Sequence, residues 1–212
     1  MSSGAEWRLC SWFEQPSTAD DRRELAELVK PLLDSLQPVW HPLGFIHVRL
    51  ATLSSHETIR LHLWPADQKH VAEQFDKVHD HLFNVASRVV SGEVTNIRYC
   101  FTPDDDGDWR EVRVRYGEKQ SELQETGLTG RLDALGSTQY CAPATYDVPR
   151  YELHETVLSG VSSALTVVRT DSASSYFPRA IFRRDSPLPP PRAPVACSQR
   201  QWRDLLGELI PI

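Results

Sequence analysis

The feature that most constrains this chain is a succession of short apolar segments between turn residues. They run from about residue 46 to residue 185 and include HVRLATL, ETIRLHLW, VTNIRYCF, REVRVRYG and YELHETV. In REVRVRYG, Val112, Val114 and Tyr116 alternate with charged residues, which is the period of a strand with one buried face. Turn signals occur at Ser91-Gly92, at Asp104–Gly107 and at Gly127–Gly130. Many short strands at this spacing predict an all-β sandwich or barrel.

Helices are expected at both ends of this strand-rich region. Leucine and valine recur at helical spacing from about Thr18 to Leu36, and Pro31 inside that pattern predicts a kink or a break. Near the C-terminus, Ser198 and Gln201 form a capping box in front of an apolar stripe. We therefore expect an N-terminal and a C-terminal helix packed outside the barrel.

The expected organisation is a single domain in three parts. A helical extension covers residues 1–45, a β-barrel covers 46–185, and a proline-rich strap with the C-terminal helix covers 186–212. The strap, Pro187–Pro194, is typical of an extended segment. The terminal helices could mediate a homodimer.

Composition excludes several classes of function. The net charge of −6 and the pI near 5.7 give no basic face for nucleic acid or for an anionic membrane. The first residues lack a secretory signal and no apolar run could span a bilayer, so we expect a cytoplasmic protein. Four scattered cysteines without a CxxC pair are expected to be free thiols. Phosphate loops, GxSxG elbows and HExxH motifs are missing from the sequence.

Histidine carries the strongest chemical signal. His79 and His81 flank one aspartate, and on a strand two residues at this spacing point to the same side. Imidazole is the commonest ligand for zinc, iron, copper and nickel. Two ligands hold a metal weakly, so a third is needed, and the candidate is His154, after a turn near Pro149.

Together these segments resemble a cupin. The resemblance covers roughly residues 75–160: an HxH motif with a Ser-Gly turn about ten residues later, and a second motif with one histidine after a Tyr/Pro turn. It implies a double-stranded β-helix whose two motifs meet at the barrel mouth. On this resemblance His79 and His81 match the HxH motif, and His154 matches the second-motif histidine.

One departure from the family changes the expected ligand set. Many cupins have a glutamate four or five residues after the second histidine, where this chain has Val85 and Ala86. The remaining three-histidine set is similar to that of thiol dioxygenases and related non-haem iron oxygenases. The cysteine–tyrosine crosslink of thiol dioxygenases is not carried over, because position 86 is alanine. The resemblance implies iron(II), with zinc, nickel and manganese as alternatives.

Arginine and tyrosine side chains are candidates for substrate contacts. Arg60 and Arg98 lie on strand faces with other polar residues, and guanidinium binds a carboxylate through two hydrogen bonds. Tyr151 could lend a phenol to the same cavity. His62 shares a face with Arg60, and its role stays open between a fourth ligand, a partner of a ligand and a pocket wall.

The sequence therefore predicts an iron(II)-dependent oxygenase or oxidase acting with O2 on a small polar substrate of the amino-acid or thiol type. The alternatives are a metal-dependent isomerase or lyase that does not use O2, and a non-catalytic small-molecule-binding cupin.

Overall fold

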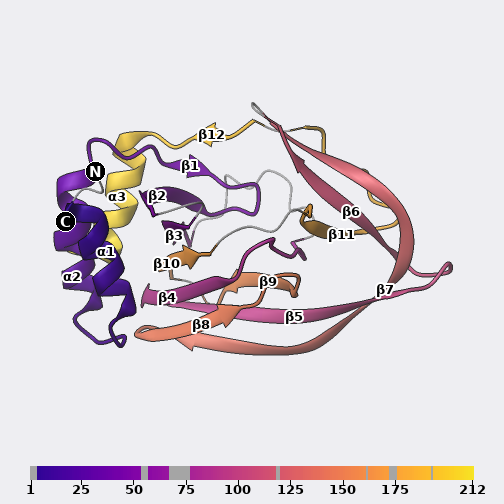
Figure 1. Cartoon of the computed structure of the whole chain (residues 1–212), viewed down its shortest axis with the longest axis horizontal. Helices are drawn as coiled ribbons and strands as arrows, with labels where there is room; N and C mark the ends of the chain where they lie inside the picture. The colour runs from indigo at the N-terminus through magenta and orange to yellow at the C-terminus, as the bar shows by residue number, and fades with distance from the viewer. Residues whose placement is uncertain are drawn as a thin grey trace.

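Two antiparallel sheets face each other in the computed structural model of the chain (Figure 1). The structure describes residues 4–53, 57–66, 77–117, 120–160, 162–171, 176–191 and 193–212. The seven-stranded sheet has the order β12 (Val195–Ala196), β1 (Val39–Trp40), β2 (Ile46–Thr52), β3 (Thr58–Trp64), β10 (Ala164–Thr170), β4 (Val85–Ser91), β8 (Ala144–Val148). The five-stranded sheet has the order β11 (Arg179–Arg183), β6 (Trp109–Tyr116), β7 (Ser121–Cys141), β5 (Glu93–Pro103), β9 (Leu153–Leu158).

The strand order is that of a double-stranded β-helix. Within the larger sheet the order β3-β10-β4-β8 places strands from distant parts of the chain side by side. In the other sheet β9 pairs with β5 and β5 with β7, and the segment around His79 pairs with β9. From β7 to β12 successive strands alternate between the two sheets, as in jelly rolls. The expected cupin-like all-β fold is confirmed.

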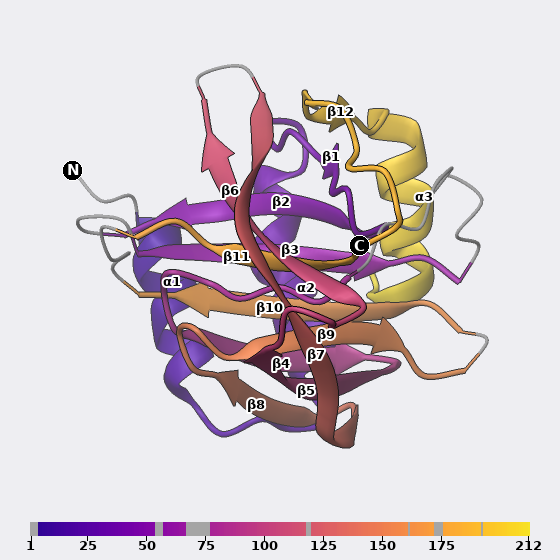
Figure 2. The same cartoon turned by 90° about the vertical axis from the view of Figure 1, so that its right-hand side faces the viewer.

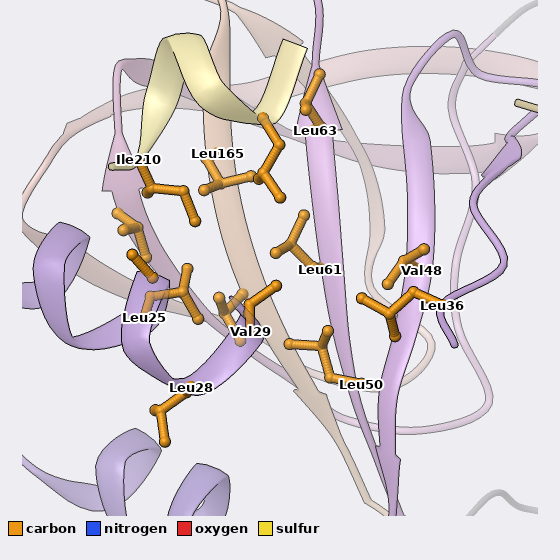
Figure 3. Packing of buried hydrophobic residues seen from close by; sticks show 14 of the residues in the cluster. Leu25, Leu28, Val29, Leu36, Val48, Leu50, Leu61, Leu63, Leu165 and Ile210 are labelled. Atoms are coloured by element: carbon orange, nitrogen blue, oxygen red, sulfur yellow. The ribbon is translucent and has the colours of Figure 1, made fainter. Parts of the chain in front are cut away.

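Three helices cover the outer face of the seven-stranded sheet (Figures 1 and 2): α1 (Gly4–Glu14), α2 (Asp21–Val29) and α3 (Gln199–Leu209). Their apolar side chains pack on Val48, Leu61 and Leu165, which point out of the sheet toward the helices (Figure 3). Ser198 caps α3 and accepts a hydrogen bond from the backbone N–H of Gln201 at 3.2 Å, as the capping box predicts. No described helix is long and apolar enough to cross a membrane.

The N-terminal region differs in detail from the sequence prediction. The pattern from Thr18 to Leu36 yields α2 and then a short 3-10 helix, η1 (Lys30–Leu32), so the break expected at Pro31 is present. Helix α1 was not predicted, because it buries only Leu9 and Trp12 and shows no long apolar stripe. In the segment PADQKHVAEQF the sequence predicts one helical turn or a loop, and most of this segment lies outside the described residues.

The turn predicted at Gly127–Gly130 is wrong, since β7 runs through it. Here β7 leaves β5 and pairs with β6: Gly130 is opposite both Pro103 and Trp109. Between Arg110 and Val112 the register shifts by two residues, and Gly127 in β7 has φ +81°. Glycine therefore serves a bulge that bends a long strand, a role that resembles a turn in sequence.

The face of the seven-stranded sheet that looks toward the other sheet is partly polar. Because Ile59, Leu61 and Leu63 pack on the helices, alternation turns Arg60, His62 and other side chains of β3 inward. Trp64 on the same face packs with Val94 of β5 and Val89 of β4, which fills one end of the interior with apolar groups. Elsewhere the interior also carries imidazole and guanidinium groups, among them His62 and Arg60.

Candidate metal centre

Three imidazoles gather at one point of the interior. The ligand atoms of His79, His81 and His154 all lie within 4.8 Å of one another. The ring centroids are 4.8 Å apart for His79 and His81, 4.6 Å for His79 and His154, and 4.9 Å for His81 and His154. Within the described chain this is the only group of at least three histidine, cysteine or carboxylate side chains so arranged.

Backbone pairing brings these histidines together. His79 and His154 exchange two hydrogen bonds, with N to O distances of 3.0 and 2.9 Å. On its other side the segment pairs with β11, because Ile181 N donates to Val78 O at 2.9 Å and Asp80 N donates to Arg179 O at 3.0 Å. His79 thus forms bridges to both outer strands of the five-stranded sheet. The motif is an extended bridge segment before β4 and not a regular strand of its own.

Two of the imidazoles are oriented by backbone carbonyl groups. Nδ1 of His79 lies 2.8 Å from the carbonyl oxygen of Lys77, and Nδ1 of His154 lies 3.1 Å from that of Glu152. A carbonyl oxygen only accepts, so Nδ1 carries the proton in each ring and Nε2 keeps its lone pair. Metal-binding histidines are commonly held this way. The three residues therefore fit a divalent transition metal.

Burial keeps these rings neutral. It lowers the pKa of His154 to about 3, with a further contribution from the neighbouring His79. Burial also lowers the pKa of His81 well below its ordinary value, followed by the effects of His79 and His154. Burial likewise lowers the pKa of His79. A neutral imidazole offers its lone pair without first releasing a proton, so the site is preset for a cation.

The aspartate between the two motif histidines is anchored from β11. Asp80 is 1% exposed, and its carboxylate accepts from the backbone N and from Nε of Arg179 at 2.6 and 2.7 Å. The same guanidinium contacts Glu111 of β6 at 3.4 Å and the carbonyl oxygen of Tyr151 at 3.2 Å. Arg179 therefore connects the HxH segment, β6 and the turn before His154.

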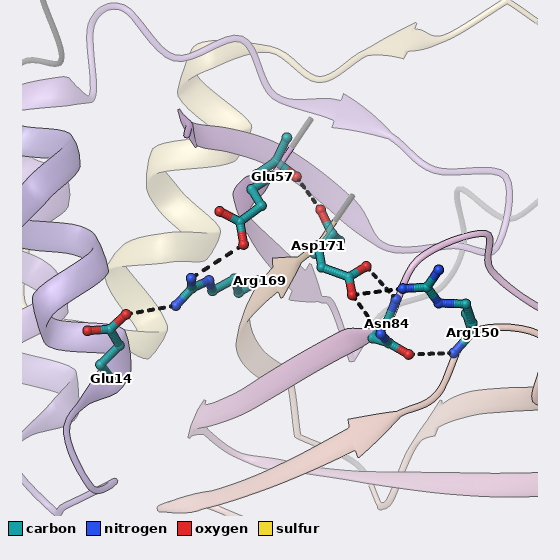
Figure 4. Close-up of polar contacts among 8 residues, drawn as sticks. Glu14, Glu57, Asn84, Arg150, Arg169 and Asp171 are labelled. Atoms are coloured by element: carbon teal, nitrogen blue, oxygen red, sulfur yellow. Dashed lines mark hydrogen bonds and ion pairs between the residues drawn. The ribbon is translucent and has the colours of Figure 1, made fainter. Parts of the chain in front are cut away.

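A second polar group fastens the other side of the motif (Figure 4). Asn84 donates from its backbone N and from Nδ2 to the carboxylate of Asp171 at 2.8 and 2.6 Å, and its Oδ1 accepts from Arg150 N at 3.0 Å. Next to this group, Tyr151 N donates to His81 O at 2.9 Å. The end of the HxH segment is thus tied to the turn that leads into His154.

The structure places Arg60 toward the three imidazoles. Its guanidinium carbon lies 5.6 Å from the centre of the Phe83 ring, and Phe83 stacks on His81 with centroids 5.1 Å apart and planes at 14°. Arg60 is half-buried and faces the interior. One aromatic ring therefore separates the guanidinium from a candidate metal ligand.

Arg98 and Tyr151 are placed differently. Arg98 is directly opposite His154 in the β5–β9 register, but its side chain is exposed, and no contact of it with the three imidazoles occurs among the described residues. Tyr151 has a φ of 66° and is 41% exposed, and its ring lies 6.3 Å from that of Tyr176. Its backbone is linked to the site, because its N donates to His81 O and its carbonyl oxygen accepts from Arg179.

A further group of rings lies beside the three histidines. His62 packs against Phe45 and Trp64, with centroids 4.7 and 6.4 Å away, and His47 lies 6.4 Å from His62. His41 stacks on Phe45 at 4.3 Å. Burial lowers the pKa of His62 well below its ordinary value, and that of His47 to about 4. His62 is thus part of a wall of neutral rings and lies outside the group of three.

Sequence reasoning missed several residues of this region: Asp80, Asn84, Glu111, Asp171, Arg179, His41 and His47. Arg179 follows Asp80 by about one hundred residues, so no local pattern joins them. For His47 alone the sequence held a signal: strand alternation places it on the same face as Arg49, two residues further along β2.

The comparisons with known proteins reach only solved structures of low identity. No family model and no curated protein sequence matches the chain. The DMSP lyase DddQ from Ruegeria pomeroyi is similar with a TM-score of 0.45 and 10% identity, over 81% of this chain and 74% of that chain. The hydroxypropylphosphonic acid epoxidase from S. wedmorenis gives 0.41 and 11%, over 65% of this chain and 56% of that chain.

A third similar structure is an uncharacterised Klebsiella pneumoniae protein with a double-stranded β-helix domain, with a TM-score of 0.36 and 12% identity over 72% of this chain and 95% of that chain. This chain, by its own strand pairing, has a cupin-like fold with a three-histidine cluster.

Proposed function

We propose that this chain is a mononuclear non-haem iron(II)-dependent oxygenase or oxidase that acts on a small polar substrate of the amino-acid or thiol type. The observation that carries the proposal is the convergence of His79, His81 and His154, two of them with Nδ1 held by backbone carbonyl groups. This arrangement supports binding of one divalent metal by three neutral ligands.

When bound, iron(II) would supply the redox chemistry with O2, since a neutral ligand set leaves the ion its full charge and open positions. The chain supplies orientation. Arg179 and Asn84 fasten the segments that carry the histidines, and Arg60 offers a positive charge to an acidic group of the substrate. Arg98 and Tyr151 belong to the proposal as residues at the edge of the site.

Two other functions are alternatives to the oxygenase or oxidase. The same histidines could hold zinc, nickel or manganese for isomerase or lyase chemistry without O2, because imidazole binds all of these metals. The chain could instead be a non-catalytic small-molecule-binding cupin, as the lack of a carboxylate ligand at Val85 or Ala86 suggests.

The test is elemental analysis of protein purified without added metal, beside the His154→Ala variant. We expect near-stoichiometric iron in the wild type and little in the variant, because two imidazoles hold a metal weakly. O2 uptake with small amino acids and thiols then follows. Product formation without O2 uptake would favour the isomerase or lyase, and failure to bind iron(II) even under anaerobic loading would defeat the metalloenzyme proposal.

A further inference from the structure

Four basic side chains form two directly opposed pairs on the inner face of β2 and β3. In the register of these strands His47 is opposite His62, and Arg49 is opposite Arg60. Directly opposed side chains have Cβ atoms about 4.5–5.5 Å apart. We call these four residues the basic quartet.

The basic quartet has little compensation within the protein. Among the described residues no carboxylate forms an ion pair with Arg49 or Arg60. The hydrogen bond of the Arg60 guanidinium within the described chain is from Nε to Thr58 Oγ1, at 2.9 Å. Other half-buried arginines are matched: Arg179 contacts Asp80 and Glu111. Like charges directly opposite each other on two strands are destabilising. A negatively charged ligand between Arg49 and Arg60 would offset this repulsion and explains why the two arginines are opposed.

The quartet borders the three-histidine site. Arg60 stands over Phe83, which stacks on His81. At the outer end Arg49 is exposed, so the quartet runs from the interior to solvent. A ligand bound to it would lie beside the candidate metal centre and could enter from outside.

We propose that the basic quartet binds a phosphoryl dianion, so that the small polar substrate of this site carries a phosphate-ester or phosphonate group. Two guanidinium groups bring two positive charges, and a dianion balances both, whereas a monocarboxylate leaves one uncompensated. Guanidinium forks match the oxygens of a phosphoryl group, and the neutral imidazoles of His47 and His62 each offer one N–H. The inference rests on the proposed function only in placing this anion beside the metal.

The experiment is calorimetric titration of the full chain with inorganic phosphate at about pH 8, where phosphate is mainly a dianion, and with acetate in parallel. The variants are Arg49→Gln and Arg60→Gln. The matched control is Arg200→Gln, which removes the same charge from an arginine 93% exposed on α3. His154→Ala is titrated too, and the metal content of every protein is measured.

We expect phosphate to bind the wild type, the control and His154→Ala alike, and each quartet variant about tenfold or more weakly. Acetate should bind far more weakly than phosphate. In the absence of phosphate, Arg49→Gln should raise the Tm, because it removes the like-charge contact.

The proposal is overturned if phosphate does not bind, if both quartet variants bind it like the wild type, or if acetate binds equally well. Phosphate binding by a protein that takes up no metal would defeat the proposed function and leave this inference standing. Metal uptake without phosphate binding would defeat this inference and leave the proposed function standing.

Discussion

Nε of Arg179 lies 2.7 Å from Oδ2 of Asp80, the residue between the two histidines of the HxH motif. Asp80 is nearly fully buried, whereas 33% of the Arg179 side chain is exposed. The pair links the outermost strand β11 to the segment that carries two candidate metal ligands. Its integrity should therefore decide both stability and metal affinity.

Replacing Arg179 with leucine should leave Asp80 and Glu111 buried without their cation. We expect the free energy of unfolding to fall by about 2–4 kcal/mol, below the full cost of breaking a buried pair because Arg179 is partly exposed. Metal affinity should fall about tenfold or more, since Arg179 no longer holds the segment that carries His79 and His81. Urea unfolding and titration against a chelator measure the two effects. Arg179→Lys should recover part of both; unchanged metal affinity in Arg179→Leu would contradict the role.

Asn84→Ala removes the side-chain bonds that tie the HxH segment to Asp171 and to the backbone of Arg150. We expect a loss of about 1–2 kcal/mol of stability and about tenfold weaker metal binding. Asp147→Ala, an exposed position on the neighbouring β8, is the matched control. If Asn84→Ala lost stability while metal affinity stayed at the wild-type value, the group would be structural only.

The metal-free protein should lose stability in acid through its buried histidines. Burial lowers the pKa of His47 from 6.5 to about 4. Below about pH 6.5 the unfolded chain takes up a proton that the folded protein does not, so the contribution of His47 is complete above that pH and is lost as pH falls toward 4. The slope from one such histidine is at most about 1.4 kcal/mol per pH unit.

Urea unfolding in the presence of a chelator, repeated from about pH 7 to pH 4.5, measures this slope. His47→Gln cannot titrate, so its stability should depend less steeply on pH than that of the wild type. Equal slopes for the two proteins would mean that His47 is not held neutral by the fold.

Arg88 and Asp21 form a buried pair on the helix side of the seven-stranded sheet, with side chains 1% and 2% exposed and Nε 3.5 Å from Oδ2. Arg88 also lies 4.5 Å over the ring of Trp12 and donates to its carbonyl oxygen at 2.9 Å. Asp21→Ala should cost about 3–5 kcal/mol, because it leaves a buried charge unpaired.

The double variant Asp21→Leu, Arg88→Met should recover much of that loss, since both charges are then removed. Metal content of the folded double variant should match the wild type, because His79 and His154 lie in segments paired within the five-stranded sheet, away from the helix side of the seven-stranded sheet. Urea unfolding and elemental analysis check both statements, and a fully tolerated Asp21→Ala would show that the pair contributes little.

Much of the fold could be predicted because strand periodicity and turn residues are local. Alternation in β3 placed Arg60 and His62 on one face, and the structure turns that face inward. The wrong turn prediction at Gly127–Gly130 also had a local cause. Glycine is typical both of turns and of bulges that need a positive φ, and Gly127 lies at a bulge inside β7.

By itself the sequence determined the strand-rich character, the outer C-terminal helix with its cap at Ser198, and the HxH spacing with His154 as its third partner. Only the tertiary structure decided that Arg179 holds Asp80, that Arg49 faces Arg60, and that Arg98 stays exposed. The physical reason is that alternation tells which face a residue occupies, whereas its neighbours depend on the register between strands that are far apart in the chain.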